Sequence, residues 1–131
     1  METKKRYILL KDLEVYKLAR ELSKIAWKVY EGLSWQEKKT MGDQFIESVD
    51  SIGANIAEGY GRHHFLDQIK FYYNARGSFN ECCQHWIEIL NERKKVDAEN
   101  YKQFKDVADK LSLKLNNFIS AIYRVKAING N

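Results

Sequence analysis

Proline is absent from all 131 residues of this chain, and its absence limits the folds that the chain can adopt. Proline interrupts helices because its ring clashes with the preceding turn and its nitrogen carries no proton. Glycine, the other common helix breaker, occurs seven times and is confined to a few places. Such a chain is most simply built from long helices joined by short turns.

Apolar residues recur at helical spacing in four stretches, over about residues 12–32, 35–59, 65–94 and 97–126, after a basic arm of residues 1–11. Candidate helix caps are Asp12, Ser34 with Glu37, and Asp97. The last stretch is the most regular, with apolar positions at Tyr101, Phe104, Ala108, Leu111, Leu115, Phe118 and Ile122. We therefore predict an all-α fold, an antiparallel up-and-down four-helix bundle formed by residues 1–131 as a single domain.

The same spacing predicts which side chains face the core and where the helices come close. In the third stretch the inward positions are Ile69, Tyr72, Ala75, Phe79, Cys82 or Cys83, Trp86 and Leu90. Gly42 and Gly53 interrupt the second stretch, where we expect the backbone of a neighbouring helix to approach closely. Gly59-Tyr60-Gly61 predicts a helix end and a chain reversal, and residues 127–131 are expected to fray.

A polar stripe accompanies the apolar face at the centre of the chain. Ser51, Asn55, Glu58 and Arg62 follow one another at steps of four, three and four, and on the next helix Asn74, Ser78, Glu81 and His85 repeat this spacing. A solvated flank is the simplest interpretation of such a stripe. The alternative that we favour is a structural hydrogen-bond network of Ser51, Asn55, Glu58, Arg62, Ser78 and Glu81, which fixes the helical hairpin or a contact between subunits.

The sequence offers little for catalysis or for metal binding. The histidines are His63, His64 and His85, and none is preceded by glutamate at the spacing of di-metal bundles. Cys82 and His85 supply at most two zinc ligands, so a core position is the better interpretation for Cys82. We predict no catalytic residues, no metal and no cofactor.

The cysteines and the apolar runs bear on localisation. Cys82 and Cys83 are adjacent and diverge on a helix, so no disulfide framework is expected. No signal peptide is recognised, and no apolar run approaches the roughly 20 residues of a membrane helix. We therefore expect a reducing, cytoplasmic setting without a membrane partner.

The formal net charge of +4, from 22 Lys and Arg against 18 Asp and Glu, is mildly basic. Such a balance is compatible with an RNA or DNA partner but is common in ordinary proteins. Stripes on the first and last helices are the candidate contacts, and they comprise Lys17, Arg20, Lys24, Lys28, Lys102 and Lys105. A solvated face diluted by Glu and Asp is the equally weighted alternative, and no base-reading module is evident.

Four segments together resemble one known family. These are residues 12–19 (DLEVYKLA), Ser51-Ile52 with 55–59 (NIAEG), Gly61-Arg62, and residues 75–81 (ARGSFNE). The chain resembles the bacterial four-helix bundle family of 23S rRNA intervening-sequence proteins, to which the accessory variability protein of diversity-generating retroelements is also similar. The resemblance covers nearly the whole chain, and its segments are specific as a set.

The resemblance implies a homopentamer without catalytic activity. For the retroelement relatives it also implies nucleic-acid binding through a basic surface and association with a reverse transcriptase. Many members carry arginines shortly before Ser-Ile, whereas Gln44-Phe45-Ile46-Glu47 stands here. That difference leaves the first and last helices to supply any positive surface.

Two classes of function follow from these observations. The first is a homo-oligomeric, non-enzymatic bundle that binds nucleic acid without sequence preference or serves as a scaffold. The second is an adaptor that docks a partner protein, such as a reverse transcriptase, and does not touch nucleic acid.

Overall fold

The computed structural model describes residues 7–129, and the side chains of residues 7–128. All regular structure in this part of the chain is helical, which confirms the predicted all-α class. In chain order the elements are η1 (Leu10–Asp12), α1 (Glu14–Glu31), α2 (Trp35–Glu37), η2 (Lys38–Gly42), α3 (Asp43–Tyr60), α4 (Phe65–Asn80), η3 (Glu81–Trp86), α5 (Ile87–Glu92) and α6 (Ala98–Asn129).

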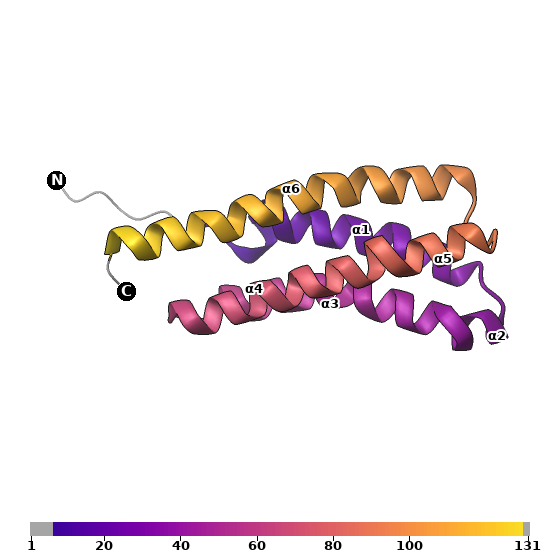
Figure 1. Ribbon diagram of the computed structural model, residues 1–131, viewed down its shortest axis with the longest axis horizontal. Helices are drawn as coiled ribbons and strands as arrows, with labels where there is room; N and C mark the ends of the chain where they lie inside the picture. Colours follow the sequence, from indigo (N-terminus) through magenta and orange to yellow (C-terminus); the bar gives the residue numbers. More distant parts are fainter. Residues whose placement is uncertain (1–6, 130–131) are drawn as a thin grey trace.

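These elements form four rods, because α2, η2 and α3 run into one another, as do α4, η3 and α5 (Figure 1). The first rod, α1, packs against α3 and α6, and α4 packs against α3 and α6 on the opposite side. Successive rods run in opposite directions, so the arrangement is the predicted antiparallel up-and-down bundle (Figure 1). The beginning of α1 and the end of α6 lie at the same end of the molecule.

The start of the first helix differs from the prediction. Asp12 belongs to the 3-10 turn η1, and the N-cap of α1 is Leu13, which gives no side-chain cap. Leu13 is buried, so the chain must turn its side chain into the core before the helix begins. The arm that precedes it is docked where it is described, since the Tyr60 hydroxyl donates to the Ile8 carbonyl. Residues 1–6 of the predicted arm lie outside the described residues.

The other predicted caps are confirmed. The Ser34 hydroxyl accepts from the Glu37 backbone N–H at 3.1 Å, and the Glu37 carboxylate accepts from the Ser34 N–H at 2.8 Å, which is a capping box. The Asp97 carboxylate accepts from the Asn100 N–H at 2.7 Å and caps α6. The expected fraying of residues 127–129 is wrong, because α6 continues to Asn129, the residue before Gly130. Residues 130–131 lie outside the described residues.

Two π-helical segments, η2 and η3, were not predicted and alter the register of their rods. A π turn holds one more residue than an α turn, so the positions that follow it rotate around the helix. Trp86, which we placed in the core, is therefore only partly buried, and Ile87 is fully buried in its place. The predicted inward positions before η3, from Ile69 to Phe79, are buried as expected.

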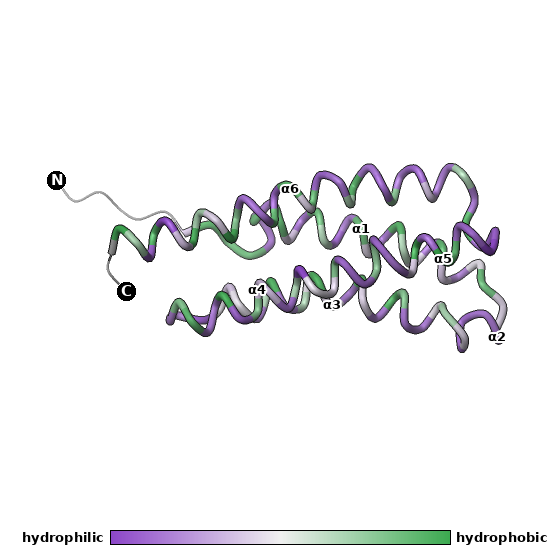
Figure 2. Tube along the Cα trace, in the orientation of Figure 1, coloured by the Kyte–Doolittle hydropathy of each residue, from purple (hydrophilic) through white to green (hydrophobic). Residues whose placement is uncertain are grey.

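The core runs the length of the bundle between the four rods, and the apolar positions gather on their inner sides (Figure 2). Phe45 and Phe104 meet in the core near the starts of α3 and α6, with ring centroids 5.5 Å apart, and Tyr72 meets Phe118 edge-on at 4.9 Å. Ser48 is the buried polar residue of the described chain, and its hydroxyl donates to the Phe45 carbonyl at 2.8 Å. Among the described residues, no buried side-chain nitrogen or oxygen lacks a hydrogen-bond partner.

The predicted approach of a neighbouring backbone at Gly42 and Gly53 is wrong, because side chains are the nearest atoms at both glycines. A Cβ at Gly42 would lie 2.7 Å from Leu33 Cδ1, so the close neighbour is a side chain and not a backbone. At Gly53 the nearest atoms, on Ala19 and Tyr16, are 3.7 Å away, which is ordinary contact. The reversal predicted at Gly59-Tyr60-Gly61 is present, since α3 ends at Tyr60 and α4 begins at Phe65.

Candidate functional site

The outer face of α1 carries a hollow lined mainly by basic side chains. Lys17, Arg20 and Lys24 recur on successive turns and point outward, and all three are exposed. Together with Lys11 they surround a shallow hollow of about 450 Å³, whose remaining lining residues are Tyr16 and Glu21. Four cations therefore face one carboxylate. We call this hollow, lined by Lys11, Tyr16, Lys17, Arg20, Glu21 and Lys24, the basic hollow.

The Arg20 side chain is held in place within the basic hollow. Its guanidinium donates to the Tyr16 hydroxyl at 2.9 Å and lies 5.7 Å from the centre of the same ring. A guanidinium that is already positioned loses less freedom when it meets a phosphate or carboxylate. The geometry thus suits recognition of an anion.

Lys28 belongs to a different surface. It lines a neighbouring hollow with Lys24, but there the carboxylates of Glu21 and Asp106 balance the two lysines. Lys28 is therefore exposed without contributing to a region of excess positive charge. The predicted row of basic residues along α1 is thus positively charged over its first turns, whereas carboxylates offset its charge over the last turns.

The two predicted contacts on α6 are occupied by carboxylates. Lys102 donates to Asp106 at 2.7 Å on the same helix, and Lys105 donates to Glu88 at 2.8 Å across the α5–α6 contact. The pKa of each lysine is raised, mainly by the hydrogen bond to its carboxylate. The structure therefore separates these two lysines from Lys17, Arg20 and Lys24.

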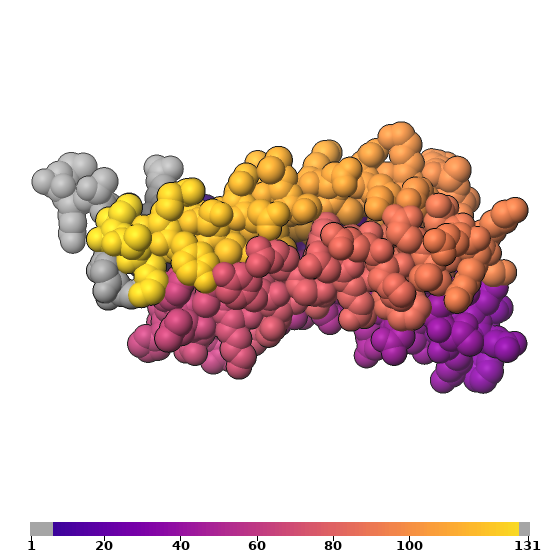
Figure 3. All heavy atoms as spheres, viewed as in Figure 1, coloured from indigo at the N-terminus to yellow at the C-terminus, as the bar shows by residue number. Residues whose placement is uncertain are grey.

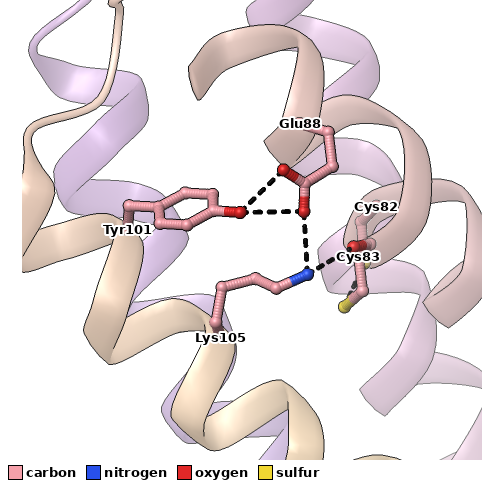
Figure 4. A network of polar contacts seen from close by, with 5 residues as sticks. All are labelled: Cys82, Cys83, Glu88, Tyr101 and Lys105. Carbon is pink, nitrogen blue, oxygen red and sulfur yellow. Dashed lines mark hydrogen bonds and ion pairs between the residues drawn. The ribbon is translucent and has the colours of Figure 1, made fainter. Parts of the chain in front are cut away.

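Lys105 is part of a polar network that ties α6 to α5 and η3 (Figure 4). The Tyr101 hydroxyl lies 2.7 and 3.0 Å from the two Glu88 carboxylate oxygens, and Lys105 Nζ also lies 3.5 Å from the Cys83 carbonyl. Burial alone would raise the pKa of Glu88, but the hydrogen bonds from Lys105 and Tyr101 outweigh it, and the pKa is lowered. The network has the character of a structural clasp between two helices.

The polar stripe makes its hydrogen bonds within each helix. The Asn55 amide donates to the Ser51 carbonyl at 2.8 Å, and Arg62 pairs with Glu58 at 2.5 Å one turn away. On the neighbouring rod the Glu81 carboxylate accepts from Trp86 Nε1 at 3.3 Å.

Among the described residues, no hydrogen bond joins the stripe of α3 to Ser78 or Glu81. Ser51, Asn55 and Ser78 are partly buried and Glu58, Arg62 and Glu81 are exposed. The described contacts therefore do not show the predicted network across the hairpin, and a contact between subunits stays a prediction.

The residues considered for catalysis do not converge. His63, His64 and His85 are exposed, whereas Cys82 and Cys83 are buried. The Sγ atoms of Cys82 and Cys83 lie 3.4 Å apart, so the two side chains do not diverge as predicted, although both remain free thiols. The burial of Cys82 agrees with its core interpretation and raises the pKa of its thiol. Within residues 7–129 no group of three or more His, Cys, Asp or Glu side chains is placed to hold a metal ion.

Sequence reasoning missed an apolar groove at the end of the bundle where the chain termini lie. The groove has a volume of about 310 Å³ and is lined by His63, Phe65, Gln68, Phe118, Ala121, Ile122, Val125 and Lys126. It arises because α6, with 32 residues, continues beyond the start of α1, so its apolar face loses one neighbour. The unequal lengths of the first and last predicted helices were the signal for it.

Sequence reasoning also assigned no role to Trp27 and Trp35, which are both exposed. Trp27 falls outside the apolar spacing of the first helix, and Trp35 directly follows the cap Ser34, so both positions could have been recognised as outward-facing. Within the described residues, no helix combines the length and the apolar character needed to cross a membrane.

Comparisons with known proteins agree with this architecture. A crystal structure of a protein with unknown function from the S23 ribosomal protein family of Bacteroides thetaiotaomicron VPI-5482 superposes with a TM-score of 0.74 at 26% sequence identity. The alignment covers 84% of this chain and 98% of that one. A comparison with curated proteins finds no match. A family model described as 23S rRNA-intervening sequence protein matches residues 11–117, and the chain therefore belongs to that family.

Proposed function

We propose that the protein binds nucleic acid without sequence preference, through the basic hollow on α1. The observation that carries this proposal is the lining of the hollow, in which Lys11, Lys17, Arg20 and Lys24 face the single carboxylate of Glu21. The family is named for an intervening sequence of 23S rRNA, which favours RNA as the natural ligand. The structural neighbour carries a ribosomal protein family name, which is consistent with that choice.

The spacing of the cations suits contacts with a phosphate backbone. Lys17 and Lys24 lie two helical turns apart, which is about 10.5 Å at the usual rise of 1.5 Å per residue. Cations at this spacing can neutralise neighbouring phosphates of one strand but do not read base edges. Binding should therefore be similar for different sequences and should weaken steeply as the salt concentration rises.

A pair of matched variants tests this proposal. Lys17→Ala with Lys24→Ala removes two exposed cations of the hollow, and we expect the affinity for labelled RNA at low salt to fall about 5- to 30-fold. The control is Lys102→Ala, which removes an exposed lysine that is paired with Asp106. We expect the control to leave the affinity unchanged. Equal affinities for the double variant and the wild type would reject the basic hollow as the binding surface.

We further propose that the protein acts as a non-enzymatic homo-oligomer, a homopentamer by resemblance to its family. Two surfaces support a contact between copies. The apolar groove includes the exposed Val125, and Leu66, in an adjacent hollow, and Ile128, further along α6, are exposed as well. Large exposed apolar patches are unusual on a monomer. The polar stripe of α3 is the second surface, because the side-chain hydrogen bonds of Asn55 and Glu58 in the described structure join them only to Ser51 and Arg62 of the same stripe.

Light scattering on the purified protein tests the assembly. We expect the mass of several chains, and a smaller mass for the variants Val125→Ser and Asn55→Ala if their surfaces form the contact. A mass of one chain for the wild type would reject the assembly.

The two free thiols, Cys82 and Cys83, fit our further proposal of a cytoplasmic setting.

The alternative function is that of a protein-binding adaptor, and the apolar groove is the observation that favours it. A partner such as a reverse transcriptase would then occupy the groove, and the basic hollow would have no ligand. The two functions differ in two measurements. An adaptor of this kind binds no RNA even at low salt. In addition, Val125→Ser weakens its complex with the partner protein and leaves the mass measured by light scattering unchanged.

A further inference from the structure

Two tryptophans at the end of α1 and the start of α2 are exposed to an unusual degree. Half of the Trp27 surface and 75% of the Trp35 surface are open to solvent. Tryptophan is normally well covered, because a large ring contributes most to stability when it is buried. The α2–η2 segment that carries Trp35 projects below α5, at the lower right of Figure 3.

Each of these rings is supported by a neighbouring side chain. Trp27 stacks on Tyr30, with ring centroids 5.2 Å apart and 26° between the planes. Lys39 Nζ lies 5.5 Å from the centre of the Trp35 ring, and Lys38 Nζ lies 4.9 Å from that of Tyr30. Rings held in this way need little further ordering to receive another flat group.

Trp27 also continues the face of α1 that forms the basic hollow. Lys17, Arg20, Lys24 and Trp27 follow one another at steps of three, four and three residues, so they share one side of the helix. Trp27 thus lies about 4.5 Å further along the axis than Lys24. A strand whose phosphates follow the basic hollow toward α2 reaches this ring next.

Charge does not favour phosphate at the aromatic end of this face. Glu31 is exposed one turn beyond Trp27, and the Asp43 carboxylate accepts a hydrogen bond from the Tyr30 hydroxyl at 2.6 Å. These carboxylates offset Lys38 and Lys39, so phosphates gain little there. The neutral face of a base, in contrast, can stack on the exposed indole. A duplex keeps its bases stacked inside and would present its phosphates instead.

We infer that the ligand of this face is single-stranded nucleic acid, with phosphates in the basic hollow and unpaired bases stacked on Trp27 and Trp35. The inference rests on the proposed function and names the ligand class for the same surface. It also extends the binding surface from α1 onto α2.

Direct binding measurements test the inference. Labelled single-stranded RNA, and the same strand annealed to its complement, are titrated with the wild type and with Trp27→Ala and Trp35→Ala. Stacking of one base on an aromatic ring typically corresponds to about a 5- to 100-fold change in affinity. We expect a loss in this range for the single strand with each variant, unchanged binding of the duplex, and recovery of most of the affinity in Trp27→Phe and Trp35→Phe.

Intrinsic fluorescence supplies a second readout from the same samples. Stacked bases should quench the emission of Trp27 and Trp35 when single-stranded RNA is added. The control is Trp86→Phe, because Trp86 is partly buried and its Nε1 donates to Glu81. Quenching should persist in this control and disappear in the double variant Trp27→Phe with Trp35→Phe.

The possible results separate the inference from the proposed function. Equal affinity for both forms of RNA, with alanine variants that bind as the wild type does, would overturn the stacking while leaving the basic hollow as a binding surface. A drop in the assembled mass of Trp27→Ala or Trp35→Ala would place these rings between copies of the chain and would also overturn it. Absence of RNA binding by the wild type would reject both.

Discussion

Replacing Lys105 by methionine should lower stability and leave nucleic-acid binding intact, because its ammonium is engaged in the clasp of Figure 4. The variant keeps the apolar stem of the side chain and removes the charge, so Glu88 loses its ion pair and retains only the Tyr101 hydroxyl. Glu88 would then be a partly buried carboxylate without a neighbouring cation. Burying an unpaired charge costs free energy relative to leaving it in water, so the folded state loses stability.

The size of the effect follows from the exposure of the pair. The two side chains are 34% and 33% exposed, so the pair lies between a surface ion pair and a buried one. Surface pairs contribute about 0.2–1 kcal/mol, and breaking a buried pair costs about 3–5 kcal/mol. Allowing for screening by solvent at this exposure, we expect a loss of about 1.5 kcal/mol. With an unfolding entropy of about 2.1 cal/mol/K per residue, this corresponds to a fall in Tm of about 5 °C.

The assay combines thermal unfolding with RNA titration on the same samples, at matched protein concentration because assembly also affects Tm. A double-mutant cycle with Glu88→Gln isolates the pair from other effects of each change. The matched contrast is Lys24→Ala, which should weaken RNA binding and leave Tm unchanged. If Lys105→Met keeps its Tm and instead loses RNA affinity, the Lys105 ammonium is available to the ligand. That result would refute its role in holding Glu88.

Three further predictions concern the fold. Lys94 adopts a φ of 57° at the end of α5, where its neighbour's N–H, that of Lys95, bonds to the Leu90 carbonyl. Lys94→Gly should therefore raise the unfolding free energy by about 0.5 kcal/mol in chemical denaturation, while Lys94→Ala, which keeps a Cβ in the left-handed region, should not. A Cβ at Gly59 would lie 2.6 Å from Cε1 of the buried Tyr72, so Gly59→Ala should lower stability by about 1–3 kcal/mol. Gly77 has no atom within 4 Å of such a Cβ, so Gly77→Ala should raise stability by about 0.5–1 kcal/mol, and the opposite order of the two variants would contradict the packing of α3 on α4. Hydrogen bonds from Lys95 and Ser34 lower the pKa of Glu37 from 4.5 to about 2, so Glu37 stabilises the fold above pH 4.5 and loses this contribution as the pH falls toward 2. The difference in stability between the wild type and Glu37→Gln should shrink over that interval, and a constant difference would contradict the lowered pKa and the hydrogen bonds from Lys95 and Ser34 that cause it.

The all-α architecture could be predicted because the local sequence of each helix identifies its apolar face and most of its boundaries. Ser34 with Glu37 and Asp97 are caps whose side chains bond to the adjacent turn, so a few residues suffice to recognise them. Asp12 was wrongly predicted as the cap of the first helix, because the helix begins after the buried Leu13, and the burial of Leu13 depends on the rest of the bundle. The π turn of η3 was missed for a related reason, since the register of Trp86 and Ile87 is decided by packing against the other rods.

The candidate site was predictable only in part. The stripe of Lys17, Arg20 and Lys24 follows from helical spacing, and the structure adds Lys11 from the preceding turn. The helical spacing predicts Lys105 as an outward-facing lysine in the same way. Its partner Glu88, however, is 17 residues away on another helix, and no local pattern reveals that pair. The exposure of Trp27 and Trp35, in contrast, could have been recognised from their positions in the sequence.

The dependence of RNA affinity on salt tests the central claim most directly. If the four cations of the basic hollow hold the strand, the logarithm of the association constant should fall linearly with the logarithm of the salt concentration. The slope should be about −3 for single-stranded RNA, at about −0.7 for each phosphate neutralised, and Lys17→Ala with Lys24→Ala should reduce its magnitude by about half. A slope near zero, or a slope that this double variant leaves unchanged, would contradict the account.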